Sequence, residues 1–155
     1  MLQALANAPN TTAHMFGVDH FYDSPCAMDY DPFMHAQMIG ASLVSNMTLP
    51  RDMPAAYSHE MDLIFFRGDQ LDDEERCNIT HEIVHFEHKD DGKAKFQEDR
   101  AERTTALRLI RPSRLSEVMV YTDDHAEAAR ELRVTEKVMR CYLRMARNGT
   151  LPRRY

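Results

Sequence analysis

The sequence predicts an α+β fold in which a small, mainly antiparallel sheet packs on two consecutive helices. Short runs of β-prone residues, separated by turn formers, lie between residues 41 and 66. Two longer segments with helical features follow, the first opening on four consecutive acidic residues and the second ending before Pro112. With 155 residues, 43% of them apolar, the chain can bury one hydrophobic core.

Three parts of the chain differ in their patterns. Residues 1–30 have weak periodicity and several turn formers, so we expect an N-terminal arm there. Residues 31–147 are expected to form a single domain, which includes a C-terminal helical pair at residues 123–147. Residues 148–155 contain Gly149, Pro152 and two arginines, so we expect a frayed tail.

The sheet is expected to come from the first part of the domain. Pro32 favours the start of a short helix, which Gly40 ends. Ala41 to Met47 is then typical of a strand, and Ala55 to Glu60 of a short strand or a turn. Met61 to Phe66 is the clearest strand, because it ends in four large apolar residues followed by a turn sequence.

Two helices are expected next. The first has negative charge in its opening turn, as the helix dipole favours, from Asp72, Asp73, Glu74 and Glu75. It also has an apolar face, formed by Ile79, Ile83, Val84 and Phe86. The second helix is expected from about Ala94 to Arg111, since Pro112 disfavours helical conformation in the residue before it.

His81, Glu82 and His85 form the pattern H-E-x-x-H on the first of these helices. Helical residues four apart lie one above the other, so the two imidazoles can bind one metal ion. Zinc is the expected metal, because it accepts neutral imidazole and lowers the pKa of a water in its open position to about 7. Glu82 would lie beside that water and act as a general base. The alternative is a pair of surface histidines that bind no metal.

The third metal ligand is expected on the second helix. A catalytic zinc takes three protein ligands, and two histidines with one glutamate are a known set. Glu98 is the first choice, and Glu102, one turn further, would accept a hydrogen bond from a ligand histidine or serve as an alternative ligand. Asp99 is the other alternative. For each of these carboxylates, the plainer hypothesis is a solvated position on a helix surface.

The composition also predicts the cellular compartment of the protein. The three cysteines, Cys26, Cys77 and Cys141, have no spacing typical of a disulfide framework, which favours free thiols and a reducing compartment. No run of about 18 apolar residues and no signal-like start occurs, so we expect a cytoplasmic protein without a membrane span. The net charge is -6, but basic residues gather after residue 100.

Taken together, these motifs resemble the ImmA/IrrE family of small metallo-endopeptidases, which occur in bacteria, phages and integrative elements. The resemblance covers roughly Asp31 to Leu143. Its residues are Leu63-Ile64-Phe65-Phe66, Glu75-Arg76, His81-Glu82-Ile83-Val84-His85, Glu98 through Ala106, Leu109-Ile110 and Pro112. In that family a glutamate in an E-x-x-A pattern follows on the next helix, which Glu98 and Ala101 match. Counted back from Pro112, the same ligand would instead be Asp99.

The resemblance implies a zincin-like fold and a zinc-dependent endopeptidase. Its substrate would be a regulatory protein, such as a helix-turn-helix repressor of a phage or mobile element. Glu82 would take a proton from the attacking water and return it to the leaving amine, and the strand from Met61 to Phe66 would offer an edge for an extended substrate. Four residues could stabilise the oxyanion, with nothing in the sequence to choose among them: Tyr57, His59, Tyr121 and His125.

A different function class is suggested by residues 128–143. They resemble a helix-turn-helix, with Thr135 as cap of a second helix that bears Lys137, Arg140 and Arg144. Arg133 stands in the turn where glycine is usual. The alternative to a peptidase is therefore a non-catalytic protein that binds a repressor or DNA through this segment. The sequence does not indicate an oligomeric state.

Overall fold

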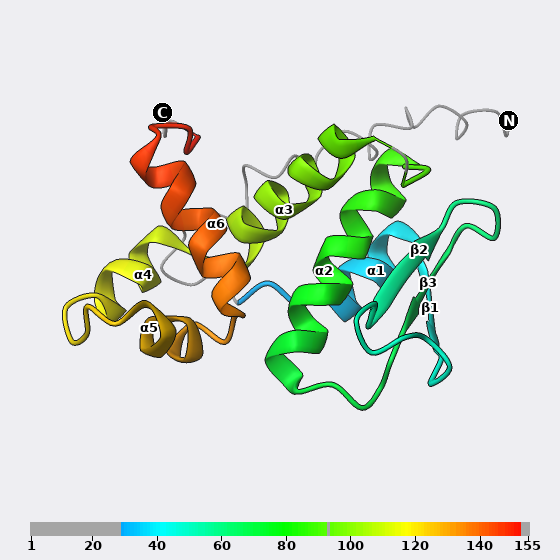
Figure 1. Cartoon of the computed structure of the whole chain (residues 1–155), viewed down its shortest axis with the longest axis horizontal. Helices are drawn as coiled ribbons and strands as arrows, with labels where there is room; N and C mark the ends of the chain where they lie inside the picture. The colour runs from blue at the N-terminus through cyan, green and yellow to red at the C-terminus, as the bar shows by residue number, and fades with distance from the viewer. Residues whose placement is uncertain (1–28, 93, 153–155) are drawn as a thin grey trace, which may run out of the picture.

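The computed structural model of the chain describes residues 29–92 and 94–152. Within these residues the chain is an α+β fold with a three-stranded sheet and six helices (Figure 1). In chain order the elements are α1 Pro32–Ile39, β1 Ser42–Ser45, β2 Ala55–Ser58, β3 Leu63–Phe66, α2 Asp72–His88, α3 Lys95–Leu109, α4 Pro112–Val118, α5 His125–Glu131 and α6 Glu136–Arg147. The expected α+β class is confirmed. Nearly all of the expected N-terminal arm, residues 1–28, and the tail from residue 153 lie outside the described residues.

The sheet is mixed rather than mainly antiparallel, so this part of the expected fold was wrong. Its strand order is β1-β3-β2, with β3 parallel to β1 and antiparallel to β2. A short turn joins β2 to β3 as a hairpin. Strands β1 and β3 therefore run in one direction and β2 runs in the opposite direction. The central position of β3 also contradicts the expectation that Met61 to Phe66 forms an edge, because both of its sides are paired within the described sheet.

Local capping explains why α1 begins and ends where it does. The carboxylate of Asp31 accepts hydrogen bonds from the backbone N–H groups of Phe33 at 2.9 Å and Met34 at 3.2 Å. Gly40 ends the helix with φ 73°, a left-handed conformation that glycine adopts without strain. The expected short helix with its glycine stop is therefore confirmed.

Two hydrophobic clusters lie on opposite sides of α2. One cluster joins α1, the sheet and α2, and consists of Ala36, Ala41, Ile64, Ile79, Ile83 and Phe86. The other is built around α3 to α6, with Ile110 and Met139 fully buried at its centre. Figure 1 shows α2 between the sheet on one side and α3 with α6 on the other. Residues of α2 therefore belong to both clusters, and packing on its two sides fixes the position of this helix.

No helix in the described part of the chain combines the length and apolar character needed to cross a bilayer.

The C-terminal helical pair consists of α5 and α6, joined by a short turn. Thr135 caps α6, since its side chain accepts a hydrogen bond from the backbone N–H of Val138. Arg133 occupies the turn with φ 54°, the left-handed conformation that glycine usually supplies in such turns. The backbone carbonyl of Arg133 accepts a hydrogen bond from the guanidinium of Arg76, so the turn is tied to α2.

We expect the variant Arg133→Gly to be more stable than the original protein by about 0.5–1 kcal/mol, because glycine relieves the left-handed strain at some entropic cost. The ion pair of Arg133 with Asp73 is exposed and contributes little. Arg130→Gly, at an exposed position of α5, is the matched control and should destabilise by about 1 kcal/mol. Urea unfolding of both variants measures whether their free energies of unfolding change in opposite directions. A loss of stability in Arg133→Gly would show that the contacts of the Arg133 side chain stabilise the fold by more than its left-handed backbone destabilises it.

Candidate metal centre

Helix α2 presents His81 and His85 to the same point, as their spacing of four residues predicts. The two Nε2 atoms lie 3.1 Å apart. His85 is buried and His81 is partly buried. Burial lowers the pKa of His81, and the neighbouring His85 lowers it further, which favours the neutral imidazole that binds metal ions.

Glu98, in the first turn of α3, completes a triangle with the two histidines. Its Oε2 lies 3.2 Å from Nε2 of His81, and its Oε1 lies 3.3 Å from Nε2 of His85. His81, His85 and Glu98 are the one group of three potential ligands found among the described residues. Glu98 was the first choice for the third ligand, and it is the carboxylate of α3 that lies next to the two histidines.

The size of this triangle fits a small tetrahedral ion. Ligand atoms about 2.0–2.1 Å from a tetrahedral centre lie about 3.3 Å from one another. The three measured separations of 3.1, 3.2 and 3.3 Å are close to that value. Two imidazole nitrogens and a carboxylate in this arrangement need a proton or a cation among them. The group could therefore hold a metal ion.

The other two carboxylates considered on α3 do not join the group. Glu102 is paired with Lys137 Nζ at 3.0 Å and with Arg144 at 3.8 Å. The expectation that Glu102 accepts a hydrogen bond from a ligand histidine is wrong, because its side chain is directed to α6. Asp99 follows Glu98 by one residue, which turns it about 100° around the helix. It is not part of the group of potential ligands.

The residue that orients one of the two histidines is Asp90, which sequence reasoning missed. Its Oδ2 lies 2.8 Å from Nδ1 of His85, and both side chains are buried. The Nδ1–H of His85 donates to this carboxylate, which leaves the Nε2 lone pair facing Glu98 and His81. Burial by itself would raise the pKa of Asp90, but hydrogen bonds from Arg100 and His85 hold that pKa below its usual value.

A reversal of the chain after α2 places Asp90 beside His85. Lys89 ends α2 in the left-handed conformation, with φ 51°. The chain then folds back, and the backbone N–H of Asp90 donates to the carbonyl of His85 at 3.0 Å. The sequence around Lys89 indicates only a polar loop. An acidic residue just past a metal-binding helix is the one signal that could have suggested this role.

We expect Asp90→Asn to weaken zinc binding by about 10–100-fold, the usual effect of losing the carboxylate behind a ligand histidine. Asparagine can accept the same hydrogen bond but carries no charge to raise the basicity of the imidazole. Competition with a chromophoric chelator measures the affinity. Asp91→Asn, at the next position, is the control and should bind zinc as the original protein does. Equal affinities for both variants would exclude this role for Asp90.

Glu82 lies beside the metal group without belonging to it. One oxygen of its carboxylate accepts a hydrogen bond from the backbone N–H of Tyr57 in β2, at 2.8 Å. Burial raises the pKa of Glu82, while His85 and the Tyr57 N–H oppose this effect. A carboxylate with a raised pKa next to a metal group is suited to take up and release a proton.

His81 and Glu82 open onto one cleft of about 200 Å³, which lies between the segment that leads into β2 and helices α2, α3 and α6. The lining residues are Asp52, Met53, Pro54, Ala55, Cys77, Asn78, His81, Glu82, Glu102, Thr105, Thr135, Lys137, Val138 and Cys141. We call this hollow the His81 cleft. None of the four residues considered for oxyanion stabilisation lines the His81 cleft. The hydroxyl of one of them, Tyr57, donates a hydrogen bond to the carboxylate of Asp62 at 2.9 Å.

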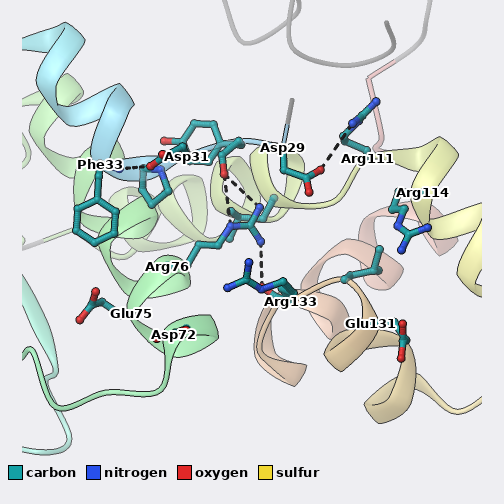
Figure 2. A pocket seen from close by; sticks show the side chains of 14 residues that line it. Asp29, Asp31, Phe33, Asp72, Glu75, Arg76, Arg111, Arg114, Glu131 and Arg133 are labelled. Carbon is teal, nitrogen blue, oxygen red and sulfur yellow. Dashed lines mark hydrogen bonds and ion pairs between the residues drawn. The ribbon is translucent and has the colours of Figure 1, made fainter. Parts of the chain in front are cut away.

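A larger hollow of about 470 Å³ lies elsewhere and contains none of the metal-group residues. Figure 2 shows the side chains of Arg76 and Arg111 joined to other residues of the protein. Arg76 donates to the backbone carbonyls of Tyr30 and Arg133, and Arg111 lies 3.7 Å from Asp29. These contacts join the start of α1, the first turns of α2 and the turn before α6. We assign this hollow a structural role, despite its greater volume.

Comparisons of the chain with protein-family models, with curated proteins and with solved structures found no match.

Proposed function

We propose that this protein is a zinc-dependent endopeptidase with a zincin-like active site, similar to those of the ImmA/IrrE family. The observation that carries the proposal is the triangle of His81, His85 and Glu98, with Glu82 next to His81 on the lining of one cleft. Two histidines and one glutamate are the ligand set of a catalytic zinc that keeps one position open. An adjacent carboxylate outside the ligand set supplies the base that such chemistry needs.

Each residue would have a separate task in peptide-bond hydrolysis. His81, His85 and Glu98 would hold the ion, and Asp90 would fix the orientation of His85. Bound zinc supplies Lewis-acid chemistry, which makes water a better nucleophile and a carbonyl a better electrophile. Glu82 would remove a proton from the attacking water and later transfer it to the nitrogen of the leaving peptide.

An extended substrate would pair with β2 rather than with β3. Strand β2 is an edge of the described sheet, and its Tyr57 N–H points away from β3 to Glu82. A peptide added along this edge would therefore run past the carboxylate of Glu82. We propose a regulatory protein, such as a helix-turn-helix repressor of a phage or mobile element, as the natural substrate.

Metal content and proteolysis together test the proposal. Protein purified without added zinc is expected to contain about one zinc per chain and to cleave unfolded casein. A chelator should abolish cleavage, and added zinc should restore it. His81→Ala and His85→Ala should both lose zinc. His88→Ala is the matched control on α2, because His88 faces the backbone carbonyl of Val84 instead. Absence of zinc from the original protein would exclude the proposed function.

The alternative is a non-catalytic protein that binds a repressor or DNA through α5 and α6. Such a protein would bind duplex DNA with an affinity that falls as salt increases, and would do so without zinc. Lys137 and Arg144 are ion-paired with Glu102 of α3, and Arg140 is ion-paired with Glu136, so three of the four basic side chains on α6 already have acidic partners. We therefore favour the peptidase.

A further inference from the structure

The deep wall of the His81 cleft is formed by buried, uncharged side chains. They come from four elements of the fold and are Ala55, Cys77, Thr105, Val138 and Cys141. Burial raises the pKa of both thiols, which keeps them protonated and neutral. The inner part of the cleft is thus a neutral recess whose open end is bordered by His81 and Glu82.

The charged side chains that line the cleft are those of Asp52, Glu82, Glu102 and Lys137, and none of them belongs to the buried wall. Asp52 and Lys137 are exposed, and Glu102 is paired with Lys137 and Arg144. None of the residues on the deep wall could neutralise a charge brought in from solvent. A charged group that reached the buried wall would lose its water without gaining a charged partner on that wall, which is strongly unfavourable.

Thr105 gives the recess one polar group. Its side chain is buried, and its hydroxyl oxygen has no hydrogen-bond partner in the protein. A threonine in a helix normally pairs this oxygen with a carbonyl one turn back, or exchanges hydroxyl and methyl by rotation about χ1. Thr105 therefore lacks the hydrogen-bond partner that a neutral polar group of a ligand would supply. The recess therefore suits an apolar side chain or one with a single neutral polar group.

We propose that the recess receives one of the two substrate side chains that flank the cleaved bond, and that it selects an uncharged side chain of medium size. This inference rests on the proposed peptidase function. Its location follows from the position of His81 and Glu82 at the open end of the cleft. The whole cleft measures about 200 Å³, and a cavity of about 150 Å³ accommodates benzene, so the recess within the cleft has room for a side chain of medium size at most. Leucine, methionine, phenylalanine and threonine fit these limits.

Cleavage of a synthetic peptide mixture with randomised central positions tests the inference on the unmodified protein. The zinc-loaded protein is incubated with the mixture, and mass spectrometry identifies the residues on both sides of each cleaved bond. At one of the two positions, we expect Asp, Glu, Lys and Arg to be depleted at least tenfold relative to leucine and methionine. Cleavage without such depletion would overturn the inference and leave the peptidase proposal intact. No cleavage of peptides or casein would overturn both.

Two variants that fill the recess test its location. Val138→Phe should shift the preference at the same position to glycine and alanine, by about tenfold relative to leucine. Cys141→Met adds a more flexible side chain and serves if Val138→Phe does not fold. Arg140→Ala, on the exposed side of the same helix, is the control and should keep the original preference. A folded, zinc-loaded filling variant with an unchanged preference would overturn the inference.

Discussion

Glu82→Gln should retain one zinc per chain and cleave peptide bonds about 10²–10⁴-fold more slowly than the original protein, because it removes the proposed general base. Glutamine keeps the shape of the side chain, and its amide oxygen can still accept the hydrogen bond from the Tyr57 N–H. The geometry of the cleft should therefore survive. The change removes only the ability to take up a proton from the attacking water.

Initial rates of casein cleavage, together with zinc content, measure this effect. Glu75→Gln is the matched control, since it changes a carboxylate two turns earlier on α2 that does not line the His81 cleft. We expect that control to cleave at the original rate. Cleavage by Glu82→Gln at the original rate would assign the base to another residue and leave the metal group without its expected partner.

Glu98→Ala is expected to weaken zinc binding by more than about 100-fold. This estimate exceeds the 10–100-fold effect of losing an outer partner, because Glu98 would contact the ion itself. Its two oxygens lie 3.2 and 3.3 Å from the two histidine nitrogens, so no other carboxylate is needed to complete the triangle. The two histidines that remain would hold zinc only weakly.

Asp99→Ala and Glu102→Ala are the matched controls for this prediction, because both remove a carboxylate from the same helix. We expect both to keep one zinc per chain. Glu102→Ala would lose the ion pairs with Lys137 and Arg144, and its effect should be confined to stability. Metal analysis of the three variants side by side measures the outcome. Loss of zinc from Asp99→Ala instead of Glu98→Ala would show that the third ligand is Asp99 and not Glu98.

Features that depend on nearby residues could be predicted from the sequence. The short helix before β1 follows from an Asp cap, a proline and a terminal glycine, all within ten residues. The apolar face of α2 and the convergence of His81 and His85 follow from helical periodicity alone. These predictions held because a helix fixes the relative positions of residues three and four apart.

The sequence narrowed the third candidate ligand to three acidic residues of α3 but could not select one of them. Glu98 and Glu102 share one stripe of the helix, so periodicity cannot separate them. The position of α6 separates them, because Lys137 and Arg144 pair with Glu102 and leave Glu98 facing the histidines. Asp90 could not be identified either, because its contact with His85 depends on the backbone reversal at Lys89.

The sequence by itself determined the α+β class, the helix that carries His81, Glu82 and His85, and the caps that bound α1. Only the tertiary structure decided the strand order β1-β3-β2, the role of Asp90, the pairing of Glu102 with α6 and the His81 cleft. The physical reason is the range of the interactions. Caps and periodicity act within a few residues, whereas strand order and the site's surroundings depend on packing between segments that are far apart in the chain.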